Sequence, residues 1–300
     1  MNSFLGMLPS VLMIVSPILI TAAGGMICER SGVVNIALEG LMSIGAFSAA
    51  AAHVLLETST GGSVWFALLI GALMGTVFSL IHAFAAISLN ADQTVSGTGI
   101  NLLANGVTIF AAQILFQMDR SRPFQLGMLP GPGGIYPTAW VALVVIAAVW
   151  FMLYKIPFGL RLRACGEHPP AAASAGLKVK RIRYFAVLAS GFLAGLAGGC
   201  LVLTQTIQYT SNTINGAGFI ALAAVSFGRW KPLGISGSSL LFGSAVALAI
   251  YAVNIQVLRV LPSEFFSLLP YVITLAALVI FSGRNYAPMA SGKPYEKGAS

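Results

Sequence analysis

Five uncharged polar side chains recur at helical spacing within one apolar stretch of the sequence. Successive members are four, three, four and three residues apart, which places all of them on one face of a helix. In a membrane, hydroxyl and amide groups on such a face either bond a neighbouring helix or line a path for a neutral polar solute. We favour the path, and its predicted lining residues are Thr94, Thr98, Asn101, Asn105 and Thr108.

A second polar pair, Asn35 and Glu39, has the i, i+4 spacing that places both side chains on one helix face. Asn35 fits the N-cap of that helix, and Glu39 then lies in the first turn, near the positive end of the helix dipole. The pair could stabilise the helix alone, or it could also face the solute path. Glu29 and Arg30, which precede the pair, are expected to neutralise one another.

The residue types that perform covalent chemistry are scarce. The chain has two Asp residues, Asp92 and Asp119, which leaves no paired-carboxylate site for a metal-dependent membrane transferase. Its three Cys residues are scattered without metal-ligand spacing, and there is no G-x-x-x-x-G-K-[ST] phosphate loop. We expect no catalytic residue, no metal and no cofactor in this chain, so the energy for solute movement would come from a partner.

The composition places these residues in a membrane. Hydrophobic residues make up 57% of the 300-residue chain and charged residues 8%, whereas soluble domains carry about 25% charged residues. The net charge of +8 does not indicate nucleic-acid binding, because the basic residues stand at the ends of apolar runs, as the positive-inside rule requires. Residues 1–300 are predicted to form a single transmembrane domain.

Runs of apolar residues predict an all-α polytopic membrane protein with about eight to ten transmembrane helices, some of them broken. The segment 217–228 is too short to cross a hydrocarbon core of about 30 Å, so it is expected to be a half-helix. It shares Ile-Ala-Leu with the segment 32–47, which predicts an inverted repeat. The expected spans are 9–27, 37–55, 63–88, 95–116, 137–154, 184–203, 217–228, 233–255 and 265–282.

The basic residues set the orientation of the chain. Residues 155–183 hold seven of the sixteen Lys and Arg residues, between uncharged runs of 32 and 45 residues. Each Lys or Arg costs about 2.5–3.5 kcal/mol at mid-bilayer, so this loop lies outside the lipid, and short basic loops stay in the cytoplasm. Loop 155–183 and the tail 284–300 are therefore predicted to be cytoplasmic, and the N-terminus and the connection 204–216 external.

Three motifs resemble one family, the ABC importer permeases of the ribose and branched-chain amino acid type. Within that family the chain is most similar to the nucleoside branch, which works with basic-membrane-protein-type binding lipoproteins. The motifs occur in the family's order, and the resemblance covers residues 10–285. They are ERSGVVNIALEG at 29–40, GEHPPAAASAG at 166–176 and GFIALAA at 218–224.

The resemblance implies that the second motif is a coupling helix that docks on a cytosolic ATPase. The residues agree with a helix, because Pro169 and Pro170 suit its start, the Ala run favours it, and Glu167 can sit in its first turn. The expected coupling residues are Gly166, Glu167, Pro169, Ala171, Ala172 and Gly176.

The resemblance also implies the partners and the location. The partners are a cytosolic ABC ATPase, a second, homologous permease and an extracytoplasmic substrate-binding lipoprotein, and the location is the bacterial cytoplasmic membrane. The expected function is import of a small polar solute by alternating access, with purine nucleosides first, and riboflavin or a simple sugar as alternatives. Phe219 would join Asn35, Glu39 and the stripe along the path. A self-contained secondary transporter is the alternative of another class, followed by a membrane enzyme.

Overall fold

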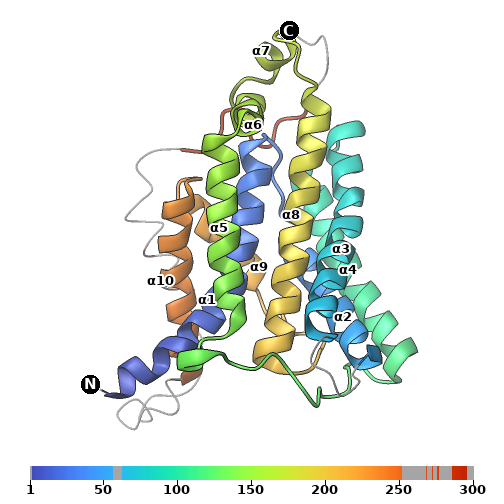
Figure 1. Cartoon of the computed structure of the whole chain (residues 1–300). Helices are drawn as coiled ribbons and strands as arrows, with labels where there is room; N and C mark the ends of the chain where they lie inside the picture. The colour runs from blue at the N-terminus through green and yellow to red at the C-terminus, as the bar shows by residue number, and fades with distance from the viewer. Residues whose placement is uncertain are drawn as a thin grey trace.

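The computed structural model describes residues 2–56, 63–251 and 286–295, together with the isolated positions 268, 272 and 276. Within these residues every regular element is a helix (Figure 1). Seven helices are long and apolar enough to cross a membrane, and α9 (Ala217–Phe227) is a shorter apolar helix. The prediction of an all-α polytopic membrane protein is confirmed. Apart from the isolated positions 268, 272 and 276, the expected span 265–282 lies outside the described residues, so the inverted repeat stays a prediction.

The seven long helices follow the predicted spans. Two of them end in a π-helical turn, η1 (Phe84–Ser88) after α3 and η3 (Val202–Thr206) after α8, and a short 3-10 turn, η2 (Pro132–Gly134), precedes α5. The long helices are α1 (Asn2–Arg30), α2 (Leu38–Leu56), α3 (Ser63–Ala83), α4 (Gln93–Phe116), α5 (Pro137–Lys155), α8 (Val179–Leu201) and α10 (Pro232–Tyr251).

The predicted basic loop forms two further helices. These are α6 (Pro157–Glu167) and α7 (Pro169–Ser174), and each begins with a proline, whose fixed φ suits the first helical position. They stand together at one end of the bundle, whereas α1 begins at the opposite end (Figure 1). Residues 286–295 return to the α6–α7 end, where the Ala290 N–H donates to the Gly166 carbonyl at 2.9 Å.

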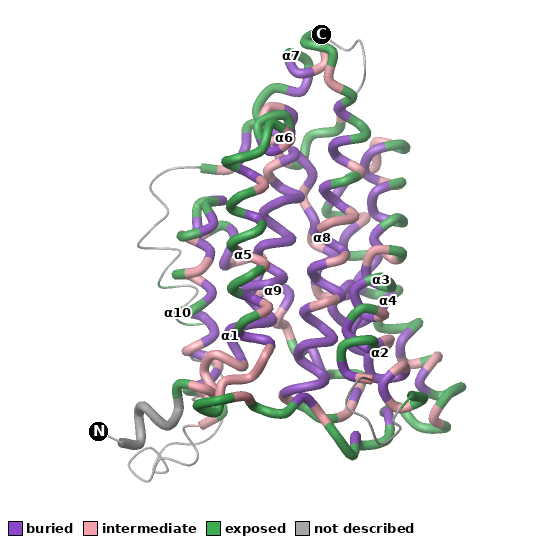
Figure 2. Tube along the Cα trace, in the orientation of Figure 1, coloured by how far each residue is buried: buried purple, intermediate pink, exposed green. Residues whose placement is uncertain are grey.

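Helices α1, α2 and α8 form the centre of the bundle, and α3, α4, α5 and α10 surround them (Figure 2). Glycine allows α3 to touch the central helices α2 and α8 backbone to backbone. An added Cβ at Gly75 in α3 would lie 2.5 Å from the Gly191 carbonyl oxygen in α8, and one at Gly71 would lie 2.7 Å from the Gly45 carbonyl oxygen in α2. Close approach of small residues is the usual way that membrane helices associate.

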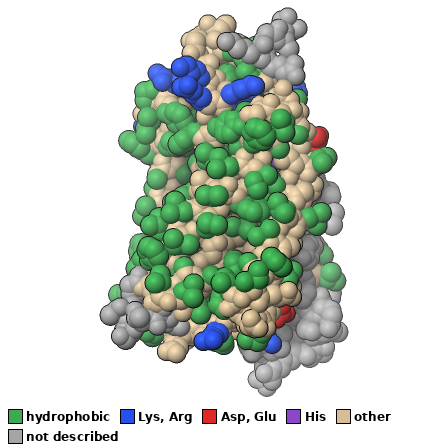
Figure 3. Space-filling view, turned by 90° about the vertical axis from the view of Figure 1, so that its right-hand side faces the viewer, with side chains coloured by type: hydrophobic (Ala, Val, Ile, Leu, Met, Phe, Trp, Pro, Cys, Tyr) green, Lys and Arg blue, Asp and Glu red, His purple; other side chains and the backbone are tan. Residues whose placement is uncertain are grey.

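The outer surface has the distribution of side chains that a bilayer requires. Figure 3 shows a face on which hydrophobic side chains cover the middle of the molecule, while Lys and Arg gather at the two ends. Large apolar side chains on the outer helices are exposed, including Leu102 and Phe110 of α4 and Trp140 and Val144 of α5. The described chain is therefore a multi-pass membrane protein.

Candidate functional site

Helix α9 is long enough to cross only about half of a hydrocarbon core. Its 11 residues extend about 16 Å at about 1.5 Å per residue. Just beyond its C-terminal end, the Trp230 carbonyl accepts hydrogen bonds from the Arg30 guanidinium at 3.0 and 2.8 Å, so this end of α9 lies level with the end of α1. Its first residues therefore lie near mid-membrane, which confirms the predicted half-helix.

The N-terminal end of α2 meets the N-terminal end of α9 at Glu39. Glu39 lies in the first turn of α2, as predicted, and its two carboxylate oxygens accept hydrogen bonds from the N–H groups of Gly216 and Gly218, each at 2.7 Å. A Cβ at Gly218 would lie 2.6 Å from the Glu39 backbone, so only glycine allows this approach. We call Glu39, Gly216 and Gly218 the helix-end junction.

The Glu39 side chain, in the first turn of α2, satisfies the start of α9. Each helix N-terminus carries unpaired N–H groups and a partial positive charge, and water cannot satisfy them in the hydrocarbon core. The Glu39 carboxylate supplies the hydrogen-bond acceptors for α9 and a negative charge near both helix ends, whereas the Gly40 N–H of α2 bonds the Asn101 side chain. The sequence indicated its place in α2 but carried no sign that it also caps α9, 177 residues further along the chain.

The predicted role of Asn35 as an N-cap is wrong. Helix α2 begins at Leu38, so Asn35 precedes the helix and does not share a helical face with Glu39. Its side chain is fully buried, accepts from the Ala37 N–H at 3.1 Å and donates to the Ser190 hydroxyl at 3.0 Å. These bonds hold a turn before the helix, and that turn delays the helix start.

Residues 31–37, which we call the α1–α2 connection, are not helical, although they lie against the bundle core. Side chains of other helices therefore satisfy their backbone. Gln93 accepts from the Val34 N–H at 2.7 Å, and a ring nitrogen of His82 lies 3.0 Å from the Val34 carbonyl. The guanidinium of Arg183 donates to the Ser31 carbonyl at 3.2 Å. The connection is thus held between α3, α4 and α8.

Two residues of the α4 stripe are buried and bonded within the bundle. The Asn101 side chain donates to the Ile36 carbonyl at 3.0 Å and accepts from the Gly40 N–H at 2.8 Å. The Thr108 hydroxyl donates to the Ala104 carbonyl of its own helix at 2.8 Å. Asn101 therefore joins α4 to the start of α2, and both of its polar atoms are already used.

The other three stripe residues, Thr94, Thr98 and Asn105, are exposed on α4. The Thr98 hydroxyl donates to the Thr94 carbonyl at 3.0 Å. Phe219, in the first turn of α9, is 49% exposed. The five stripe residues thus share one helix, but the structure does not gather them around one cavity.

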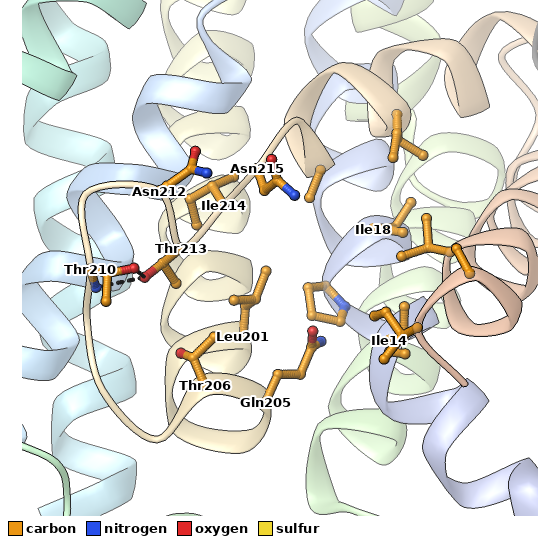
Figure 4. A pocket seen from close by; sticks show the side chains of 16 residues that line it. Ile14, Ile18, Leu201, Gln205, Thr206, Thr210, Asn212, Thr213, Ile214 and Asn215 are labelled. Carbon is orange, nitrogen blue, oxygen red and sulfur yellow. Dashed lines mark hydrogen bonds between the residues drawn. The ribbon is translucent and has the colours of Figure 1, made fainter. Parts of the chain in front are cut away.

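A cavity of about 750 Å³ lies at the end of the bundle where α1 begins (Figure 4). Its walls are α1, the end of α8 with η3, residues 210 and 212–215, the start of α9 and the end of α10. On one side it presents Ile14 and Ile18 of α1. None of its described lining residues is charged, and the polar ones are Gln205, Thr206, Thr210, Asn212, Thr213 and Asn215.

The cavity lies beside the helix-end junction, because Asn215 and Ala217 of its wall flank Gly216. The cavity was not predicted from the sequence, because residues 204–216 were interpreted as an external connection. The available signal was the density of Thr and Asn side chains between two apolar segments. The cavity and the helix-end junction together form the candidate site for a solute, and its volume falls in the usual range of about 300–1,000 Å³ for small-ligand sites.

Three of the predicted coupling residues, Glu167, Ala171 and Gly176, are exposed at the α6–α7 end. Glu167 ends α6 and lies 3.8 Å from Arg30, so its predicted place in the first turn of the coupling helix is wrong. The reason is an extended backbone at His168, with φ −144°, which separates α6 from α7. The His168 ring caps α7 instead, because it accepts from the Ala171 N–H at 3.1 Å.

The other three predicted coupling residues, Gly166, Pro169 and Ala172, are buried. Pro169 begins α7, as predicted. A Cβ at Gly166 would collide with the Arg30 carbonyl oxygen and lie 3.1 Å from the Gly32 nitrogen. These residues therefore pack the α6–α7 pair onto the bundle, and the exposed residues remain available for a partner.

Glu29 and Arg30 do not pair with each other as expected. The Trp230 indole N–H donates to the Glu29 carboxylate at 2.6 Å, and Arg30 bonds the Trp230 carbonyl and approaches Glu167. Both side chains turn toward the α9–α10 turn (residues 228–231) and the end of α6, because those elements offer a donor, an acceptor and a carboxylate at the right positions.

Comparison with known proteins identifies the family to which the chain belongs. Residues 7–278 match the family described as branched-chain amino acid transport system / permease component. The guanosine ABC transporter permease protein NupQ of Bacillus subtilis is 43% identical over 306 residues, which cover 97% of this chain and 96% of NupQ. The nucleoside ABC transporter permease protein NupC of Lactococcus lactis is 38% identical over 301 residues, which cover 94% of each chain. The chain belongs to the branched-chain amino acid transport system permease family.

Proposed function

We propose that the chain is the membrane-spanning subunit of an ABC importer for nucleosides. The observation that carries the substrate class is its similarity, over nearly the full length, to two permeases named for guanosine and for nucleosides. The cavity beside the helix-end junction supports it, because amide and hydroxyl groups among isoleucines suit a neutral base and sugar. The chain performs no covalent chemistry in this proposal.

The cavity is the external part of the path in this proposal. It ends at the helix-end junction, where α9 leads toward the α6–α7 end. Alternating access then requires α2 and α9 to move relative to one another, which closes the cavity on one side and opens a passage on the other. The exposed residues Thr94, Thr98, Asn105 and Phe219 would face this passage or a second permease.

The remaining components follow from the family and the charge distribution. The α6–α7 end would be cytoplasmic, because its Lys and Arg residues obey the positive-inside rule. A cytosolic ATPase would dock there and supply ATP hydrolysis. A second, homologous permease would complete the membrane path, and an external binding lipoprotein would deliver the solute. The location would be the bacterial cytoplasmic membrane, and residues 1–300 would form one transmembrane domain.

Uptake by the assembled transporter tests this function. Cells that express the chain with its ATPase, second permease and binding lipoprotein should take up labelled guanosine, and unlabelled nucleosides should compete. An ATPase with an inactivated phosphate loop should abolish uptake. Uptake that continues with the inactive ATPase would indicate a secondary transporter, and competition by riboflavin or a simple sugar alone would contradict the nucleoside assignment.

A matched pair of variants tests the cavity. Asn212 lines it, whereas the adjacent Ser211 is exposed and does not. Asn212→Leu should raise the solute concentration for half-maximal uptake or lower the rate, because a polar contact is replaced by an apolar side chain. Ser211→Leu should leave uptake unchanged. Equal uptake by both variants, at equal amounts of assembled complex, would remove the cavity from the path.

A further inference from the structure

Arg183 is a fully buried cation that joins three parts of the chain. It lies in the first turns of α8 with 1% of its surface exposed. Its Nε donates to the Ser31 carbonyl of the α1–α2 connection at 3.2 Å, and its Nη1 donates to the Lys293 carbonyl at 3.1 Å. Among the described residues no carboxylate pairs with it. Its guanidinium also lies 5.8 Å from the centre of the Tyr295 ring. A buried charge held by two carbonyls and a ring is expensive, which points to a specific use.

Residues 286–295, which we call the C-terminal strap, connect the same region to the coupling helices. The Ala290 N–H donates to the Gly166 carbonyl at 2.9 Å, and the Met289 N–H lies 3.4 Å from the Glu167 carboxylate. At one end of the strap, the Arg229 guanidinium of the α9–α10 turn lies over the Tyr286 ring at 4.5 Å. The strap therefore touches the end of α6, α8 and the turn that follows α9.

The end of α6 also packs directly on the α1–α2 connection. Gly166 lies against the Arg30 carbonyl and the Gly32 nitrogen with no room for a side chain. Gly32 has φ +93°, a conformation that glycine adopts without strain. Seven residues after Gly32 the chain reaches Glu39, which caps α9. A continuous set of contacts thus runs from the α6–α7 surface to the helix-end junction.

We propose that Arg183 and the C-terminal strap transmit movement of the coupling helices to the α1–α2 connection and so to the helix-end junction. This inference rests on the proposed function, in which an ATPase docks at α6 and α7. Arg183 is a positioning residue here and touches no solute. Its planar guanidinium can bond the Ser31 and Lys293 carbonyls at once with fixed geometry, whereas a lysine ammonium on a flexible stem cannot hold both in the same way.

The experiment measures transport and ATP hydrolysis separately in the reconstituted complex. Arg183→Lys keeps the positive charge and removes the planar guanidinium. Deletion of residues 288–300 removes most of the C-terminal strap. Arg181→Lys is the matched control, because Arg181 is exposed in the same turn. We expect both test variants to assemble and hydrolyse ATP, with solute transported per ATP reduced about tenfold, within the usual range of about 5–150-fold for coupling between sites. The control should match the unaltered complex.

The solute-to-ATP ratio separates transmission of movement from a purely structural role. If Arg183→Lys does not assemble, the ratio measured for the deletion variant alone supports or overturns the proposal. An unchanged ratio in either assembled variant, a parallel loss of uptake and hydrolysis, or failure of both variants to assemble would assign these residues to stability only and overturn the link. Absence of ATP-dependent uptake in the unaltered complex would instead refute the proposed function itself.

Discussion

Replacement of Glu39 by Gln tests the helix-end junction most directly. The carboxylate accepts the Gly216 N–H on one oxygen and the Gly218 N–H on the other, each at 2.7 Å. Gln has nearly the same shape, but one oxygen becomes an amide NH2 that cannot accept. One backbone N–H near mid-membrane therefore loses its partner, and the negative charge between two helix ends disappears.

The magnitude can be worked from these contacts. An unpaired buried N–H costs about 1–3 kcal/mol, and loss of charge assistance in the remaining bond costs about a further 1 kcal/mol. Loss of the charge at two helix N-termini adds about 0.3–1 kcal/mol each. We therefore expect Glu39→Gln to destabilise the protein by about 3–6 kcal/mol, and its unfolding temperature in detergent to fall on the order of 10 °C.

Glu167→Gln is the matched control. It makes the same chemical change at a carboxylate that is 49% exposed and 3.8 Å from Arg30, and such pairs contribute about 0–1 kcal/mol. Thermal unfolding of the two purified variants gives the comparison. If Glu39→Gln unfolds at the temperature of the unaltered protein, the carboxylate does not hold the two helix ends together, and the reasoning about the junction is refuted.

Burial and packing lead to three further predictions. Asn101→Leu leaves two backbone groups unpaired and should destabilise the protein by about 2–5 kcal/mol, whereas Asn105→Leu, on the exposed side of α4, should unfold like the unaltered protein. Burial raises the pKa of the Cys165 thiol, so little reactive thiolate forms at neutral pH. A maleimide added on the cytoplasmic side should therefore label the exposed position in Ser174→Cys and leave Cys165 unmodified. Labelling of Ser174→Cys by a maleimide added outside would refute the orientation. The valine side chain in Gly195→Val would collide with the Gly71 carbonyl and should prevent folding in the membrane. The measurement is the amount of purified protein that elutes as a single species in size-exclusion chromatography.

Local physical rules were enough to predict most of the helices. The apolar runs had the length of membrane spans, and the 12 residues at 217–228 were too few for one, so the half-helix α9 was expected. Pro169 was expected at a helix start, and it begins α7. These predictions succeeded because span length and proline geometry depend on neighbouring residues only.

The helix-end junction could not be predicted, because it depends on residues far apart in the chain. Glu39 fitted the first turn of its own helix, and nothing in the spacing indicated its bonds to Gly216 and Gly218. The cap assigned to Asn35 was wrong for the same reason. Its amide bonds Ser190 in α8, and this tertiary contact favours a turn over the helical start that its local preference suggested.

The α4 stripe shows how one sequence pattern can serve two purposes. Its period correctly indicated that the five side chains share one helix. A period cannot show whether an amide meets a solute or a backbone, and for Asn101 the partners are the Ile36 carbonyl and the Gly40 N–H. A broken membrane helix needs such partners wherever its backbone leaves helical geometry. Polar residues in a membrane sequence can therefore indicate broken helices as well as solute paths.

The helix-end junction also bears on which solute the cavity accepts. Helix N-termini near mid-membrane commonly bind anionic groups of solutes. Here the Gly216 and Gly218 N–H groups are taken by Glu39, and the Ala217 N–H donates to the Ile214 carbonyl at 3.1 Å. The described lining residues include no Lys or Arg. Among the described residues, a phosphate would find neither a free helix end nor a cation there and would approach the Glu39 carboxylate, so the cavity should admit nucleosides and exclude their phosphates.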